Sequence, residues 1–314
     1  MNLHEHKEDF EALIKITADH IGIPSDAVRR DYYIVKMMQN LQNSAFAKSC
    51  VFKGGTSLSK CYPGSIDRFS EDIDLTFVPE EEINNKAYNR NLKKVECVIA
   101  QGFLVEKIES ERNHRSKSAY VWPENEEKDS CRIKLEIGSS VRPDPFELRG
   151  MKTYIQEYLE NSGRADIAEE FELGTVSVNT LDITRTFLDK VMAVKRHAVC
   201  GTLTGKVRHI YDVTMLFRRD DIQEFLADEG RLKTLLRLTK ETDCYYLQKR
   251  NVSKEYDPAG LYNFDGWKQS FDNRIRRRYE TLHEDLLYTS EKQNFQEAIQ
   301  VFEKLNHIFL AVNE

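Results

Sequence analysis

The stretch from residue 49 to residue 77 constrains this chain most, because it places a strand, a glycine turn, a helix start and a second strand in close succession. Residues 49–52 are a short β-type run that ends near two glycines, and the hydroxyl residues after them suit the start of a helix. Residues 72–77 (DIDLTF) alternate polar and apolar side chains before Pro79, which predicts a half-buried strand. These elements are predicted to pack as one compact unit.

Two carboxylates share one face of the second predicted strand, because Asp72 and Asp74 are two residues apart. Adjacent carboxylates repel each other unless a cation lies between them, and Mg²⁺ prefers such oxygen ligands and shares them with substrate phosphates. The glycine turn and helix start at residues 54–57 would offer backbone N–H groups to a triphosphate. The alternative is an ordinary turn beside two solvated aspartates. Each part alone is more often structural, but the combination favours a nucleotide and metal site.

A third strand is predicted over residues 132–137, where polar and apolar residues alternate strictly. Arg132, Lys134 and Glu136 project to one face of it. If this strand lies beside the Asp72 strand, Glu136 can complete a three-carboxylate metal cluster, with Lys134 moderating its charge. The alternative is an exposed cross-strand salt bridge, and the residues alone leave both interpretations open.

The rest of the chain divides into an α/β part and a helical part. Helical periods occupy most of the first fifty residues, a charged helix is predicted over residues 80–102, and a strand over residues 103–108. Beyond about residue 165, long helical periods replace the strand pattern. A chain of 314 residues suggests about two domains. We therefore predict the α+β class, with an α/β domain over residues 1–165 and a helical domain over residues 166–314.

Two charged residues of the predicted helical domain have competing interpretations. Lys190 lies beside the apolar stripe of a helix predicted over residues 186–198, and Asp212 lies on the next helix, one turn after Arg208. By spacing alone, a solvated Lys190 and a surface ion pair between Arg208 and Asp212 are favoured.

Composition limits the location and the partners of the protein. The chain has 46 Lys and Arg against 52 Asp and Glu, but residues 231–278 hold twelve basic and six acidic side chains, so the remainder sums to −12. The net charge of −6 therefore does not exclude a nucleic-acid partner. The apolar runs are too short to cross a bilayer, and the charged first twenty residues do not resemble a signal peptide. These features predict no membrane partner, and six scattered cysteines without zinc spacing favour the reducing cytoplasm and no structural zinc.

The basic stretch is where a polyanion could dock. Phosphate contacts combined with aromatic stacking are typical of single-stranded RNA binding. The alternative is a solvated helix face. The predicted contacts are the basic residues Lys249, Arg250, Lys254, Lys268, Arg274, Arg276, Arg277 and Arg278, with the aromatic residues Tyr245, Tyr246, Tyr256, Tyr262, Trp267 and Tyr279 between them.

Residues 51–60 (VFKGGTSLSK) and 68–75 (RFSEDIDL) resemble the signature of AbiEii/AbiGii-type nucleotidyltransferases. That family comprises toxins of type IV toxin–antitoxin and abortive-infection systems on a DNA polymerase β-like nucleotidyltransferase fold. Further segments are similar to the family's other motifs, namely residues 30–35, 134–136, 185–190 and 208–212. The resemblance extends over residues 28–217, and the last hundred residues show no matching motif.

The resemblance implies a Mg²⁺-dependent enzyme, with Mn²⁺ as a substitute, that transfers a nucleotide from an NTP to an acceptor such as the 3′ end of tRNA. A cognate antitoxin is implied as a partner. The alternatives are transfer to a protein or small molecule, and nucleotide binding without transfer. By position, the implied catalytic residues are Asp72, Asp74, Lys190 and Asp212; the nucleotide-binding residues are Gly54, Gly55, Thr56, Ser57, Lys60 and Lys134; and the metal ligands are Asp72, Asp74 and Glu136.

Overall fold

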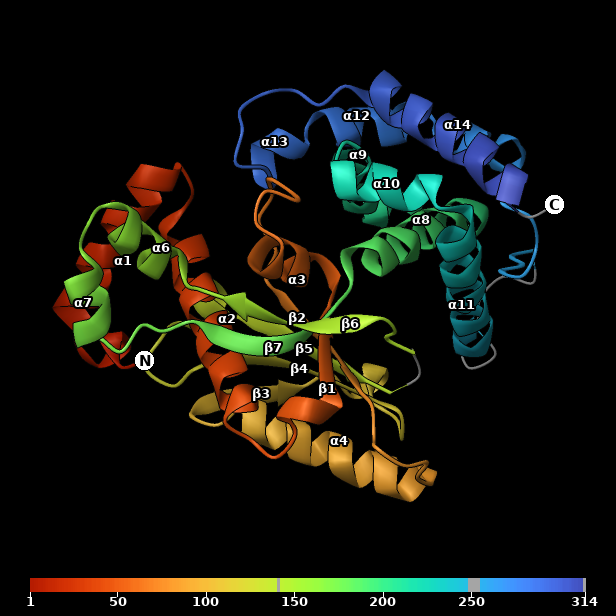
Figure 1. Cartoon of the computed structure of the whole chain (residues 1–314). Helices are drawn as coiled ribbons and strands as arrows, with labels where there is room; N and C mark the ends of the chain where they lie inside the picture. The colour runs from red at the N-terminus through yellow and green to blue at the C-terminus, as the bar shows by residue number, and fades with distance from the viewer. Residues whose placement is uncertain (140–141, 248–254, 313–314) are drawn as a thin grey trace. The chain divides into compact units, whose positions relative to one another are not determined.

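The computed structural model describes residues 1–139, 142–247 and 255–312, and the chain divides into two compact units. Unit 1 comprises residues 1–61 and 69–181, and unit 2 comprises residues 62–68 and 182–314. The short segment 62–68 thus belongs to unit 2, although unit 1 precedes and follows it in the chain. The helix and strand labels are those of Figure 1.

Unit 1 is built on a mixed sheet of seven strands in the order β3-β4-β5-β2-β1-β7-β6. The centre of the sheet combines an antiparallel β1–β2 pair with parallel β2–β5 and β1–β7 pairs. The strands are β1 (Cys50–Lys53), β2 (Asp72–Phe77), β3 (Phe103–Lys107), β4 (Ser116–Pro123), β5 (Ile133–Gly138), β6 (Phe146–Met151) and β7 (Val176–Leu181).

Helices cover both faces of this sheet, and Figure 1 shows α3 and α4 on opposite faces. Helix α4 packs against β4 and β5 and buries Leu92, Val95 and Ile99, while α3 packs against β1 and β2. The helices of unit 1 are α1 (Lys7–Ile21), α2 (Ser25–Gln42), α3 (Gly54–Cys61), α4 (Asn85–Ile99), α5 (Lys128–Cys131), α6 (Tyr154–Asn161) and α7 (Ala165–Glu170).

Unit 2 consists of helices and the loops that connect them, with no named strand among its described residues. Its helix α9 packs against α8, α12 and α14, and an aromatic cluster that includes Phe264, Trp267 and Phe302 fills part of its core. The helices are α8 (Ile183–Val199), α9 (Val207–Phe217), α10 (Asp220–Ala227), α11 (Glu229–Leu247), α12 (Asn273–Glu280), α13 (Leu282–Asp285) and α14 (Phe295–Val312). No helix in the described parts of the chain is long and apolar enough to span a membrane.

The predicted α+β class is confirmed, and so are the strands predicted over residues 72–77, 103–108 and 132–137, to within one residue. The expectation that strands end before residue 165 is wrong. Strand β7 lies beside β1 in the centre of the sheet, and its residues alternate between buried and partly exposed positions. For that reason the division between the units falls after Leu181 rather than after residue 165.

Candidate active site

The start of α3 lies directly against the carboxylate of Asp74. Strand β1 ends at Lys53 and α3 begins at the next residue, Gly54, whose φ of +88° is unfavourable for any residue with a side chain. A Cβ added at Gly54 would overlap with Asp74 Oδ2. The predicted proximity of the glycine turn to the paired aspartates is therefore present in unit 1.

We expect Gly54→Ala to destabilise the protein by about 2 to 4 kcal/mol, because it adds both backbone strain and a steric overlap with Asp74. Denaturant unfolding measures the change. The matched control is Gly138→Ala on β5, because a Cβ there meets no atom within 4 Å. Equal stability losses in the two variants would contradict the close approach of Gly54 to Asp74.

The hydroxyl groups at the start of α3 bond within the protein. Thr56 Oγ1 donates to the main-chain carbonyl of Asp72 at 2.5 Å and lies 3.0 Å from Ser70 Oγ, which connects α3 to the start of β2. Ser57 Oγ donates to the carbonyl of Gly54 at 3.0 Å. Both side chains are buried. The part of α3 suited to a phosphate is therefore its backbone N–H groups rather than these hydroxyls.

A row of charged residues crosses the face of the sheet that carries the two aspartates. In the strand register, Asp72 lies beside Lys134 of β5, and Asp74 lies between Glu136 of β5 and Lys53 of β1. The opposite face is apolar, as predicted, with Ile73, Leu75, Leu135 and Ile137 buried. Lys53 was not among the predicted site residues, although it lies in the VFKGGTSLSK segment. Its signal was its place as the last residue of a strand that ends at the glycine turn.

Glu136 forms an ion pair with Lys134, which also lies 2.9 Å from Glu111. Burial lowers the pKa of Lys134, but the hydrogen bonds and charges of Glu136 and Glu111 outweigh it, and the net shift is upward. No three His, Cys, Asp or Glu side chains in the described residues are grouped to hold a metal ion. Glu136 is paired with the neighbouring lysine rather than grouped with Asp72 and Asp74, and its role as a third metal ligand stays a prediction.

Lys60 lies at the end of α3 with its ammonium group buried. Its Nζ is 2.7 Å from Asp31 Oδ1 and 3.9 Å from the centre of the Tyr154 ring, and the two charged side chains are only 2% and 3% exposed. A phosphate contact by Lys60 would leave the buried Asp31 carboxylate without its ion partner, which is costly. Lys60 therefore has a structural ion pair in unit 1, and its expected nucleotide contact stays a prediction that would require this pair to break.

In unit 2, Asp212 is the centre of a buried charge cluster. Arg68 donates from Nε and Nη2 to the two carboxylate oxygens at 2.6 and 2.8 Å, and Lys190 Nζ lies 2.7 Å from Oδ2. Burial alone would raise the pKa of Asp212, but the charges of Arg68 and Lys190 hold it well below its ordinary value. The expectation of a solvated Lys190 is wrong, because its side chain is 6% exposed.

Two further properties of this cluster affect its charge. Burial lowers the pKa of Lys190, and it lowers the pKa of His209, whose Nδ1 is 3.8 Å from Asp212, to about 3. His209 is therefore neutral at pH 7. Arg68 was absent from the predicted residues, although it is the first residue of the RFSEDIDL segment. It belongs to segment 62–68, which connects α3 to β2.

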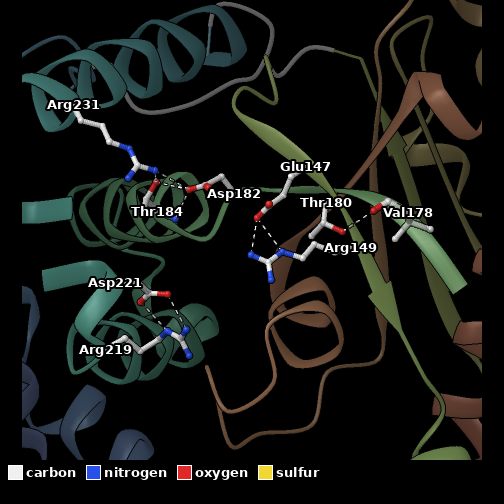
Figure 2. Close-up of polar contacts among 9 residues, drawn as sticks. All are labelled: Glu147, Arg149, Val178, Thr180, Asp182, Thr184, Arg219, Asp221 and Arg231. Atoms are coloured by element: carbon white, nitrogen blue, oxygen red, sulfur yellow. Dashed lines mark hydrogen bonds and ion pairs between the residues drawn. The ribbon is translucent and has the colours of Figure 1, made fainter. Parts of the chain in front are cut away.

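The position of Lys190 depends on the start of α8, which Figure 2 shows. Asp182 accepts a hydrogen bond from the Thr184 N–H at 2.9 Å and thereby caps the first turn of α8. Arg231 of α11 contacts both residues, with Nη2 3.7 Å from Asp182 Oδ1 and 3.4 Å from Thr184 Oγ1. The cap and the α11 contact together fix the helix that carries Lys190.

The aromatic part of the predicted RNA surface is wrong. Tyr256, Tyr262, Trp267 and Tyr279 are buried in the core of unit 2 and cannot stack on bases. Among the basic residues, Lys268 pairs with Glu303 and Arg276 with Glu280. What the structure describes does not include Lys249, Arg250 and Lys254, nor the side chains of Tyr245 and Tyr246.

What is left of that surface is one basic face of α12. Arg274, Arg277 and Arg278 are exposed and have no ion-pair partner among the described residues. These positions are three and four residues apart, so they lie on one side of the helix.

The profile of the family described as "Nucleotidyl transferase AbiEii toxin, Type IV TA system" matches residues 36–301 of the chain. No curated protein sequence gives a significant match. Two similar solved structures are the nucleotidyltransferase toxin MenT4 from Mycobacterium tuberculosis H37Rv (17% identity, 95% of this chain and 97% of that chain, TM-score 0.47) and JHP933 from Helicobacter pylori (17% identity, 93% and 99%, TM-score 0.38). Because the family profile spans most of the chain, this protein belongs to the AbiEii nucleotidyltransferase toxin family of type IV toxin–antitoxin systems.

Proposed function

We propose that this toxin transfers a nucleoside monophosphate from an NTP to the 3′ end of tRNA, in a reaction that requires Mg²⁺ or Mn²⁺. The observation that supports it most is the contact between the start of α3 and Asp74, because it brings an anion-binding helix start next to a pair of carboxylates. The proposed setting is the cytoplasm, which supplies both NTP and tRNA, and the proposed protein partner is a cognate antitoxin.

The residues present fit a divalent metal. Asp72 and Asp74 offer hard oxygen ligands on one face of β2, and Gly54 brings the helix backbone beside the second of them. A bound Mg²⁺ would neutralise triphosphate charge and favour attack at the α-phosphorus. Glu136 is proposed to join this site only after its ion pair with Lys134 breaks. It is therefore the weakest of the three expected ligands.

The chain's own residues are proposed to act mainly by positioning and by electrostatics. The backbone N–H groups at residues 54–57 would bind phosphate oxygens, and Lys53 and Lys134 would keep the acidic row from repelling the anionic substrate. Lys190 and Asp212 keep the required role that the family resemblance implies. Lys190 and Arg68 both form an ion pair with Asp212. This supports a role in which Lys190 and Asp212 contribute to activity by holding the elements of unit 2 in place around Arg68.

The test is incubation of the pure protein with each labelled NTP, Mg²⁺ and total tRNA, with a parallel reaction in EDTA. Label in tRNA that disappears in EDTA supports the proposal. Label in protein would support protein nucleotidylation instead, and tight NTP binding without any labelled product would support a binding module. Mapping the label to an internal position of the tRNA would refute transfer to the 3′ end.

The basic face of α12 is proposed to contact the phosphates of the RNA acceptor. Replacing Arg274, Arg277 and Arg278 by glutamine is expected to weaken tRNA binding and to reduce the dependence of log K on log salt by about 2, because each phosphate contact contributes about 0.7. A filter-binding titration over a range of salt concentrations measures both quantities.

The matched control removes the same number of charges from another exposed helix face, that of α4, through Arg90→Gln, Lys93→Gln and Lys94→Gln. A specific contact at α12 predicts a clearly larger effect from the α12 variant. Equal losses in the two variants would mean that RNA responds only to net charge, and a larger loss in the α4 variant would move the docking surface to α4.

A further inference from the structure

The Arg30-Asp31 pair opens the segment that resembles the family's N-terminal helix motif, and so far only Asp31 has been described, as the partner of Lys60. Both residues lie on α2, in unit 1. Asp31 is buried, whereas Arg30 is partly exposed. Adjacent residues on a helix point in different directions, so the two side chains can contact different elements.

Asp31 connects α2 to α3 and α6. Its Oδ1 lies 2.7 Å from Lys60 Nζ, at the last turn of α3, and its Oδ2 accepts the Tyr154 N–H, at the first turn of α6, at 2.7 Å. The ammonium group of Lys60 also lies over the ring of Tyr154. Both oxygens of the buried carboxylate are therefore used, and the end of α3 is held from two neighbouring helices.

Arg30 connects α2 to the residues just before β2. Its guanidinium forms an ion pair with Glu71, which directly precedes Asp72, and lies 5.5 Å from the centre of the Phe69 ring. Its Nε also donates to the Asp26 carbonyl at 3.3 Å, within the same helix. The residues just before β2 are thus held to α2 by the ion pair of Glu71 and by the ring contact of Phe69.

A third contact closes the arrangement. Thr56 Oγ1 donates to the Asp72 carbonyl, so the first turn of α3 is joined directly to the start of β2. Helix α2, helix α3 and the start of β2 are then linked in three pairs, each through a polar contact. A closed set of contacts of this kind restricts relative movement more than any single contact does.

We propose that Arg30 and Asp31 are positioning residues, which hold α3 and the start of β2 in the relative arrangement that nucleotidyl transfer requires. The inference rests on the proposed function for its catalytic consequence. Neither side chain touches the nucleotide in this proposal. Arg30 acts through Glu71 on Asp72, and Asp31 acts through Lys60 on the helix that begins at Gly54.

Two variants test the proposal without leaving a buried charge unpaired. Asp31→Asn combined with Lys60→Met removes both charges of the buried pair and keeps an acceptor for the Tyr154 N–H, and Arg30→Gln removes the ion pair with Glu71. The matched control is Arg29→Gln, because Arg29 is the adjacent residue of α2 but pairs with Glu11 and Glu126, outside α3 and β2. Arg30→Lys keeps the positive charge and serves as the conservative variant.

The first readout is amide hydrogen exchange over residues 54–61 and 72–77, at a temperature where all variants are folded. Faster exchange is expected in both test variants but not in the Arg29→Gln control. The second readout is the transfer rate, for which kcat is expected to fall by about a hundredfold, as when a reacting group is displaced by about 1 Å, while NTP affinity changes less. Arg30→Lys is expected to recover part of the loss.

Unchanged exchange in both segments would overturn the proposal, and so would faster exchange with unchanged kcat. The exchange measurement does not depend on the proposed reaction. If the wild-type protein transfers no nucleotide to any acceptor, the proposed function fails while the positioning of α3 against β2 is still tested.

Discussion

Asp74→Ala is expected to reduce nucleotidyl transfer by at least about 10² to 10³-fold, the usual cost of removing one preorganised electrostatic group. Asp74 lies beside the start of α3 and between Lys53 and Glu136 in the charged row, and Glu136 is paired with Lys134, so we do not expect Glu136 to take the place of Asp74. Initial rates with labelled NTP and tRNA measure the effect, and Asp72→Ala is expected to behave in the same way.

The control for Asp74→Ala is Glu106→Gln on β3, because it removes an exposed carboxylate from the same sheet. Its transfer rate is expected to equal that of the wild type. Thermal unfolding of each variant separates loss of activity from loss of structure. Normal transfer by folded Asp74→Ala protein would refute the proposed active site.

Asp212→Ala is expected to destabilise the protein by about 3 to 5 kcal/mol, because it leaves two buried cations, Arg68 and Lys190, without their shared carboxylate. The comparison is Asp221→Ala in the same unit. Asp221 forms a two-point ion pair with Arg219 near the surface (Figure 2), and such exposed pairs contribute about 0 to 1 kcal/mol. Urea unfolding measures both changes, and a loss below 1 kcal/mol for Asp212→Ala would contradict the buried cluster.

The stability that Asp212 contributes is expected to decrease at acidic pH. Its pKa in the folded protein is held well below the ordinary value of 3.8, so the carboxylate stabilises the fold fully above that value. The contribution is lost as pH falls below 3.8 toward the folded-state pKa. The stability difference between the wild type and Asp212→Ala should therefore shrink in acid, and a difference that grows as the pH falls would contradict this assignment.

The local patterns of the sequence were enough to predict β2 and β5, two neighbouring strands of the sheet. Residues 72–77 and 132–137 alternate strictly because one side of each strand is buried, and that side is set by the residue types alone. Two-residue periodicity also placed Asp72 and Asp74 on one face. The glycine turn was predictable for a similar reason, since a positive φ and a close backbone approach leave few other residue types possible.

The features that the sequence did not reveal concern residues whose partners are distant in the chain. The nucleotide contact of Lys60 was implied by the family resemblance, but its partner Asp31 lies in another helix, and no local pattern reports that ion pair. The aromatic residues from Tyr256 to Tyr279 looked like a stacking surface because the residues that bury several of them lie in α14, later in the chain. Strand β7 was missed because its alternating residues lie between helical segments.

Residues late in the sequence form pairs with residues near its beginning, and this affects when the protein can fold during its synthesis. Strand β1 pairs on one side with β7, where Phe52 lies opposite Thr180, and Arg68 forms a bridge with Leu287. A nascent chain that ends before residue 176 lacks β7, which is one of the two neighbours of β1 in the sheet. A chain that ends before residue 287 lacks Leu287, the β-bridge partner of Arg68 in the segment between α3 and β2. We therefore expect fragments that end before residue 287, such as those from truncated messages or stalled ribosomes, to be inactive.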